Sequence, residues 1–79
     1  PLSPDTVWKI IRMKLDILNR RLVKGHNTPV EITDELINQI AAESTQEEFG
    51  GREIDRTIKR LVEDPLAENL LSSNLMASG

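Results

Sequence analysis

Apolar side chains recur every three or four positions along the first third of the chain, and this spacing limits the possible folds most. The residues of this stripe are Val7, Ile11, Leu15, Leu18 and Leu22. Such spacing places all of them on one face of an α-helix, which Ile10 and Ile17 would widen. Ser3 before Pro4 predicts the start of this helix, and Gly25 predicts its end. We therefore expect one long amphipathic helix that buries this face.

The middle of the chain predicts one short strand and a second helix. Val30–Thr33 alternates apolar and polar residues and is rich in β-branched side chains, as strands are. A lone strand is not stable, so either its partner strand has been cut off or this stretch is simply extended. Thr33 is expected to cap the second helix. The buried face of that helix would consist of Leu36, Ile37, Ile40 and Ala41.

The last part of the chain predicts two more helices. A third helix should begin near Arg52 and bury Ile54, Ile58, Leu61 and Val62. The ion pairs expected on its polar side, at i, i+4 spacing, are Asp55–Lys59 and Arg60–Asp64. Asp64 before Pro65 predicts that this helix breaks and that a fourth restarts, reaching about Ser72. The expected fold class is α+β, mostly α, with about four helices and one short strand.

Length and composition predict one small domain. The chain has 79 residues, of which 38% are apolar, which is enough for a single small core. We expect the domain to occupy residues 1–72 and residues 73–79 to form a frayed tail. The chain begins with proline rather than methionine, which favours a piece of a longer protein.

Residue counts exclude several kinds of site. There is no cysteine, so disulfides, thiolate zinc sites and cysteine catalysis are excluded. The single histidine, His26, excludes a compact histidine-rich metal site. The acidic pairs Asp34-Glu35 and Glu47-Glu48 are explained by helix caps and solvated charge, so we predict no metal site and no catalytic residue. No apolar run approaches the roughly 18 residues of a membrane span, and we expect no membrane partner.

Charge is divided unevenly along the chain. Residues 1–26 carry six basic and two acidic side chains, a net charge of +4, whereas residues 27–79 carry four basic and eleven acidic ones, a net charge of −7. A basic first helix could bind nucleic acid. However, one tryptophan and one phenylalanine offer no platform for stacking bases. A solvated or intersubunit face is therefore the preferred interpretation, and we predict no nucleic-acid partner.

The segment Phe49-Gly50-Gly51-Arg52 is the strongest candidate for chemistry. Two glycines allow a tight turn and a close approach of the backbone to another group. The arginine stands at the expected start of a helix, where backbone N–H groups and the helix dipole favour an anion. Its forked, permanent positive charge matches phosphate oxygens. From these residues alone, a phosphate-binding corner and an ordinary surface arginine both remain open.

This segment, together with Glu63-Asp64-Pro65-Leu66-Ala67-Glu68-Asn69-Leu70-Leu71, resembles the C-terminal small domain of Clp-type AAA+ ATPases. The long first helix and the short strand at Val30–Thr33 also resemble that family, in the same order. The chain departs from the family at Gly51, where alanine is usual, and at Glu53, where proline is usual. The family's final β-hairpin is missing after Ser73. The protease-linked, disaggregase and secretion-associated branches all stay open.

The resemblance implies a role for the glycine-arginine segment. Arg52 would be the sensor-2 arginine, which reaches the γ-phosphate of ATP bound between the large and small domains. Gly50 and Gly51 would lie close to the nucleotide. The cofactor would be ATP, with Mg in the parent protein, and none would bind tightly to this chain. Because the chain lacks a Gly-x-x-x-x-Gly-Lys-Ser/Thr loop, we expect it to be inactive on its own.

The resemblance also implies a setting for the parent protein. It would be a cytoplasmic, hexameric, ATP-driven unfoldase or disaggregase. This chain would form the lid of its ATP site and contribute to ring assembly. The partners would be the large AAA+ domain, neighbouring subunits and protein substrates. The alternative is a non-enzymatic helical interaction module, which would bind a partner helix through Val7–Leu22 or Leu66–Leu71.

Overall fold

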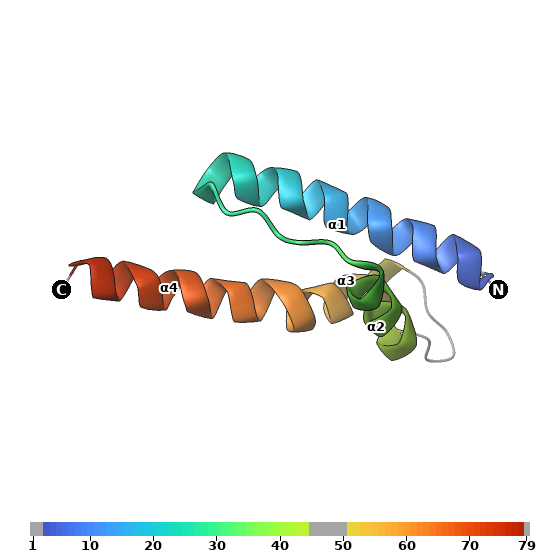
Figure 1. Ribbon diagram of the computed structural model, residues 1–79. Helices are drawn as coiled ribbons and strands as arrows, with labels where there is room; N and C mark the ends of the chain where they lie inside the picture. Colours follow the sequence, from blue (N-terminus) through green and yellow to red (C-terminus); the bar gives the residue numbers. More distant parts are fainter. Residues whose placement is uncertain (1–2, 45–50, 79) are drawn as a thin grey trace.

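The computed structural model describes residues 3–44 and 51–78, and this part of the chain is almost entirely helical. Its elements are α1 (Pro4–His26), α2 (Asp34–Ser44), α3 (Gly51–Ile58), the π-helical turn η1 (Lys59–Glu63) and α4 (Asp64–Ser78). Figure 1 shows α1 lying above α3 and α4, with an extended segment leading from the end of α1 to α2. The predicted mostly helical fold is confirmed. No helix in the described ranges is long and apolar enough to cross a membrane.

Helix α1 begins as predicted but ends two residues later than expected. The Oγ of Ser3 accepts a hydrogen bond from the backbone N–H of Thr6 at 3.2 Å, and Pro4 is the first helical residue. At the other end, Asn27 takes the left-handed conformation, with φ of 52°. Its N–H donates to the carbonyl of Val23 at 2.9 Å. The prediction that Gly25 ends the helix is wrong, because asparagine also tolerates the left-handed region.

The strand predicted at Val30–Thr33 is not formed. This stretch is extended but forms no ladder within residues 3–44 and 51–78. A strand is stable only when it pairs with another strand, and the described residues contain no second strand. A side chain holds the segment instead, because the backbone N–H of Val30 donates to the Oδ1 of Asn19 in α1 at 2.7 Å. Thr33 caps α2 as predicted, and its Oγ1 accepts from the N–H of Leu36 at 3.1 Å.

The helix that begins at Gly51 continues through Pro65 to Ser78, so the predicted break is wrong. The turn η1 ends two residues before the proline, and the N–H of Asp64 donates to the carbonyl of Lys59, five residues back. In a regular α-helix the proline ring would clash with the carbonyl four residues earlier. The wider π turn relieves this conflict without ending the helix. The backbone of α4 extends past Ser72, and the domain boundary at residue 72 stays a prediction.

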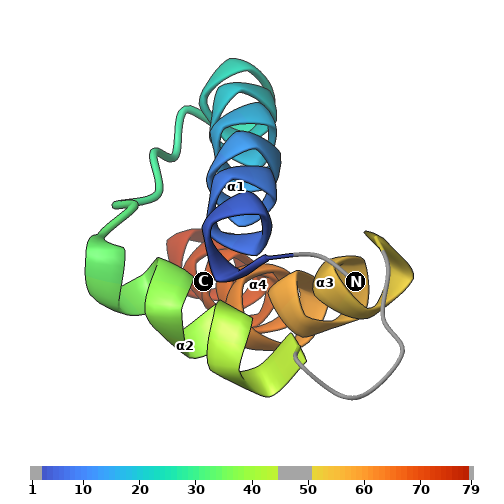
Figure 2. The ribbon, with the colours of Figure 1, turned by 90° about the vertical axis from the view of Figure 1, so that its right-hand side faces the viewer.

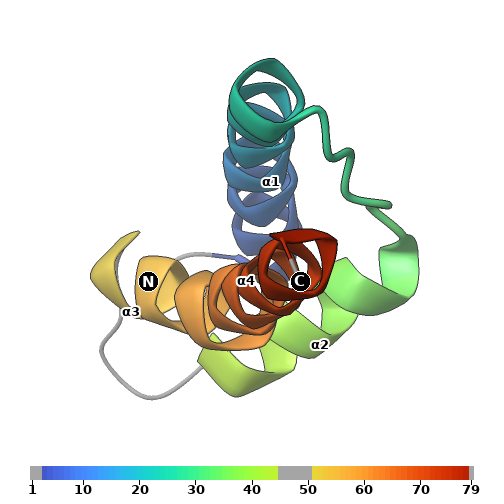
Figure 3. The same ribbon diagram turned by 90° about the vertical axis from the view of Figure 1, so that its left-hand side faces the viewer.

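The core lies where α1, α2 and the α3–η1 helix meet. Its buried apolar residues are Val7, Ile11, Leu15, Leu18, Ile37, Ile40, Ile54, Ile58 and Val62. Figures 2 and 3 show α1 above α2 and α3, and α2 packs against both. The predicted stripes of the first three helices are thereby confirmed, although Leu22, Leu36, Ala41 and Leu61 are only half-buried at the edge of the core. Ile17 is an exception, because its side chain is 54% exposed and does not widen the buried face.

Candidate functional site

The candidate site is the N-terminal end of α3. Gly51 is the first residue of this helix and Arg52 the second, whereas Phe49 and Gly50 lie outside the described residues. The side chain of Arg52 is exposed. No carboxylate within the described part of the chain forms an ion pair with Arg52. The first turn of a helix also presents N–H groups without helical partners and the positive end of the dipole. An anion that approached this end would therefore meet both kinds of positive charge.

The packing of α3 determines where Arg52 points. Ile54 and Thr57 are only 1% and 2% exposed, so this side of the helix is fixed in the core. The hydroxyl of Thr57 donates to the backbone carbonyl of Glu53 at 2.9 Å, which satisfies a buried polar group. Arg52 stands two positions before Ile54, roughly 200° around the helix. Its guanidinium is therefore directed away from the core.

Ion pairs tie α3 and η1 to the other helices. The Nζ of Lys14 in α1 lies 2.8 Å from the Oδ1 of Asp55, and an NH2 nitrogen of Arg60 lies 2.6 Å from the Oε1 of Glu43 in α2. The predicted pairs Asp55–Lys59 and Arg60–Asp64 are therefore wrong. Asp55 and Arg60 pair with side chains of other helices instead of side chains along their own helix. These ion pairs hold the α3–η1 helix, which carries the candidate site, against α1 and α2.

The remaining predicted partners pair differently because of the π turn. The Nζ of Lys59 lies 2.9 Å from the Oδ1 of Asp64. A π turn brings residues five apart onto the same side, where an α-helix would bring residues four apart together. The hydrogen bond to Asp64 raises the pKa of Lys59. The hydrogen bond from Arg60, and a weaker one from Gln39, lower the pKa of Glu43. Both shifts follow from these links between side chains.

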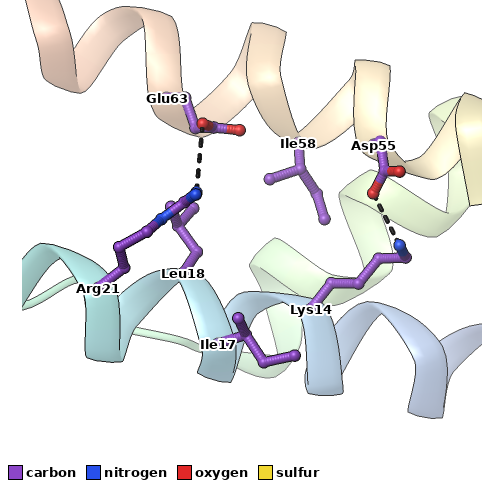
Figure 4. A pocket seen from close by; sticks show the side chains of 7 residues that line it. All are labelled: Lys14, Ile17, Leu18, Arg21, Asp55, Ile58 and Glu63. Atoms are coloured by element: carbon purple, nitrogen blue, oxygen red, sulfur yellow. Dashed lines mark hydrogen bonds and ion pairs between the residues drawn. The ribbon is translucent and has the colours of Figure 1, made fainter.

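A hollow of about 340 Å³ lies between α1 and the α3–η1 helix. Figure 4 shows the pair Lys14–Asp55 at one end and the pair Arg21–Glu63, at 3.9 Å, at the other. Between them the lining is apolar. Because its four charged groups pair with one another, this hollow offers no free charge to a ligand. Arg52 does not line it, so the hollow is separate from the candidate site.

A second hollow, of about 490 Å³, opens between the C-terminal half of α1 and α4. Leu18, Leu22, Leu66 and Leu70 form its apolar part. Arg52 does not line this hollow either. The leucines of α4 thus face α1 across an open groove rather than a closed core.

The other sequence candidates are surface groups. Asp34 and Glu35 are exposed in the first turn of α2, where negative charge suits the helix dipole. His26 is exposed in the last turn of α1, whereas Glu47 and Glu48 lie outside the described residues. Among the side chains that the structure describes, no group of three could hold a metal ion.

Comparison with known proteins assigns the chain, including the helix that carries Arg52, to a family. Residues 2–79 match the family described as the C-terminal, D2-small domain of ClpB protein. A Pseudomonas aeruginosa protein named ATP-dependent protease ATP-binding subunit-like protein AmiB is 35% identical over 99% of this chain. The negative regulator of genetic competence ClpC/MecB of Bacillus subtilis is 36% identical over 94% of it. The chain therefore belongs to the C-terminal small domains of Clp-type AAA+ proteins.

The relatives are much longer than this chain. It spans 21% of the Pseudomonas protein, 9% of the Bacillus protein and 8% of a Rhodopirellula baltica chaperone protein ClpB that is 34% identical over 94% of the chain. No solved structure matches the chain. The match to ClpB and ClpC proteins confirms the predicted family, and it covers the region of the glycine-arginine segment.

Proposed function

We propose that this domain is the lid of the ATP site of a Clp-type AAA+ ATPase, with Arg52 as its sensor-2 arginine. The observation that carries the proposal is an exposed arginine at the N-terminal end of α3, directed away from the core. Family membership supports it, because the resemblance of the glycine-arginine segment to the family motif implies that Arg52 corresponds to the motif's arginine. The residues fit a nucleotide, since guanidinium and helix N-terminus both favour phosphate oxygens.

The lid acts through this chain's own residues. Arg52 would bind phosphate charge, and Gly50 and Gly51 would allow the backbone to approach the nucleotide closely. ATP with Mg, held by the large domain of the parent, would supply the bond that is hydrolysed. The pairs Lys14–Asp55 and Glu43–Arg60 connect the arginine's helix to α1 and α2. A movement of α3 that follows the phosphate would therefore carry the whole domain with it.

The setting of the parent protein is part of the same proposal. We propose a cytoplasmic ring, hexameric as the family resemblance implies, that unfolds or disaggregates protein substrates. The names of the relatives support this, since they include chaperones and ATP-binding subunits of a Clp protease. Its partners would be the large AAA+ domain and neighbouring subunits. Membranes and nucleic acids are not among the proposed partners.

The decisive test replaces Arg52 in the full-length protein that carries this domain. Arg52→Ala should lower kcat for ATP hydrolysis, or weaken nucleotide binding, by about tenfold or more, because a charge-assisted contact to phosphate is lost. Arg52→Lys should recover only part of the activity, since lysine lacks the planar fork. The measurements are steady-state ATPase kinetics and nucleotide titration.

Arg56→Ala is the matched control, because Arg56 is also exposed and lies one turn further along α3. It should leave hydrolysis unchanged. Equal effects of the two alanine variants would contradict the sensor role of Arg52. The alternative, a non-enzymatic interaction module, predicts that neither variant changes ATP hydrolysis. The purified 79-residue chain should itself show no ATP turnover, and measurable turnover would overturn that expectation.

A further inference from the structure

Asp55 lies within reach of Arg52 on the same helix. The two residues stand three positions apart in α3, and side chains at this spacing are neighbours on the surface of a helix. An aspartate and an arginine placed in this way attract each other. Within the described part of the chain, Asp55 is the only carboxylate three or four positions from Arg52. It is therefore the group best placed to occupy the guanidinium of Arg52.

In the structure, Asp55 pairs with a different partner. The Nζ of Lys14 in α1 lies 2.8 Å from the Oδ1 of Asp55, and Figure 4 shows the two side chains directed toward each other. Arg52 is exposed and forms no ion pair with a carboxylate of residues 3–44 or 51–78. The carboxylate of Asp55 is thus bound to another helix, and it does not occupy the guanidinium of Arg52.

The surroundings of Lys14 favour this pairing. The side chain of Lys14 is 26% exposed, whereas that of Asp55 is 62% exposed. The ammonium of Lys14 is therefore partly withdrawn from water, where the attraction between opposite charges is screened less than on an open surface. A separation of 2.8 Å is also the length of a charge-assisted hydrogen bond. We therefore expect Asp55 to prefer Lys14 to the exposed Arg52.

We propose that Lys14 is a positioning residue for Arg52, because it binds Asp55 and so keeps this carboxylate from pairing with the guanidinium. The inference rests on the proposed function, since an arginine that binds phosphate must not be occupied by a carboxylate. Without Lys14, Asp55 would turn to Arg52, and phosphate would compete with it for the same fork of N–H groups. Lys14 acts through Asp55 and needs no contact with the nucleotide.

The size of the effect follows from the strength of a pair between neighbours on a helix. Such pairs are weak, so in the absence of Lys14 we expect Asp55 to occupy Arg52 in roughly 60–70% of the molecules. A function that needs the free guanidinium falls in proportion to the fraction of molecules in which it is free. Loss of Lys14 should therefore lower kcat/KM for ATP hydrolysis about two- to threefold.

Steady-state ATPase kinetics of the full-length protein that carries this domain test the proposal with three variants. Lys14→Ala should lower kcat/KM about two- to threefold. Asp55→Asn should leave it unchanged, because the competing carboxylate is gone. The double variant should behave like Asp55→Asn, since no carboxylate then remains for Lys14 to bind. An ion pair that only holds two helices together predicts equal losses for the two single changes, and this result would overturn the proposal.

NMR of the 79-residue chain follows the pairing itself, without nucleotide. The side-chain Nε–H resonance of Arg52 is assigned by its loss in Arg52→Lys. It should shift in Lys14→Ala, where Asp55 reaches the guanidinium, and should return when Asp55→Asn is added. A resonance that does not move in Lys14→Ala would overturn the proposal. Circular dichroism should show unchanged helix content in Lys14→Ala, since alanine is a strong helix former.

Lys9→Ala is the matched control, because Lys9 is an exposed lysine of α1 that forms no ion pair within the described residues. It should change neither kcat/KM nor the Arg52 resonance. An effect equal to that of Lys14→Ala would mean that overall charge is responsible, which would overturn the proposal.

Arg52→Ala distinguishes this inference from the proposed function. If Arg52→Ala lowers kcat/KM and Lys14→Ala does not, the role of Lys14 is wrong and the sensor role of Arg52 stands. If neither change lowers it, the sensor role itself is wrong, and the inference that rests on it is overturned as well.

Discussion

The end of α1 is determined by Asn27 and not by Gly25. Gly25 stays in helical conformation, since no described glycine has positive φ, and Asn27 takes the left-handed position. The N–H of Asn27 bonds to Val23, and that of Thr28 donates to the carbonyl of Leu22 at 3.3 Å. A glycine inside a helix carries an entropic cost without using its conformational freedom. Gly25 is therefore dispensable for the stop.

Gly25→Ala should stabilise the chain by about 0.5–1 kcal/mol. Alanine is the better helix former, and its methyl group restricts the unfolded chain. A Cβ at this position meets nothing within 4 Å, so no strain offsets the gain. Urea unfolding followed by circular dichroism measures the change. Asn27→Ala is the paired test, and it should destabilise by about 1 kcal/mol because the left-handed conformation disfavours alanine. Destabilisation by both changes would contradict this account.

Helix α2 is defined by its two ends. At the start, Thr33 accepts from Leu36 and bonds through its backbone carbonyl to the N–H of Ile37 at 3.1 Å. Near the other end, Glu43 reaches Arg60 at 2.6 Å. The first interaction is local and readable from sequence. The second joins residues far apart in the chain and holds α2 against the helix of the candidate site.

Thr33→Ala should lower the free energy of unfolding by about 1 kcal/mol, because the capping hydrogen bond is lost. Thr33→Ser should keep most of the stability, since serine also caps. Thermal and urea denaturation of the three chains provide the comparison. Equal loss in the alanine and serine variants would mean that the threonine methyl group, and not the cap, is responsible.

The pair Glu43–Arg60 should make stability depend on acidic pH. Hydrogen bonding lowers the pKa of Glu43 in the folded state below its ordinary value of 4.5. A lowered pKa means that the pair's stabilisation is fully present above the unfolded value and is lost as pH falls through the folded one. The free-energy difference between the original chain and Glu43→Gln should therefore shrink below about pH 4.5. Urea titrations at several pH values measure it, and a difference that does not change with pH would contradict the link.

At the scale of the whole molecule, burial decides which apolar residues stabilise the fold. Ile11 and Ile17 are the same residue type in the same helix, yet one is 0% exposed and the other 54%. Ile11 lies where α1 meets its neighbours, whereas Ile17 borders the open hollow between α1 and the α3–η1 helix. Their exchange for alanine is thus a controlled comparison of burial.

Ile11→Ala should cost about 2–5 kcal/mol, because it removes buried methyl groups and leaves a cavity. For a chain of this size, that is a large part of the total stability. Ile17→Ala should change stability by about 0.5 kcal/mol or less, as surface substitutions do. Equilibrium unfolding in urea gives both values. A comparable cost for the two changes would contradict the view that burial sets the difference between them.

Local patterns predicted the helices well because helices depend on neighbouring residues. The stripe from Val7 to Leu22 located α1, and Ser3 and Thr33 located two helix starts. The candidate site was predicted only as a segment and a role for Arg52. Its exposure and its direction away from the core come from the packing of Ile54 and Thr57. The role itself stays a proposal.

The sequence alone determined the helical class, the helix starts and the family resemblance, because each of these depends on residues near one another in the chain. Only the tertiary structure decided that Val30–Thr33 has no partner strand among residues 3–44 and 51–78, that the helix passes Pro65 after a π turn, and that Asp55 and Arg60 pair with α1 and α2. These outcomes depend on which distant group is within reach. The spacing of residues along the chain does not give the distances in space between residues that are far apart in sequence.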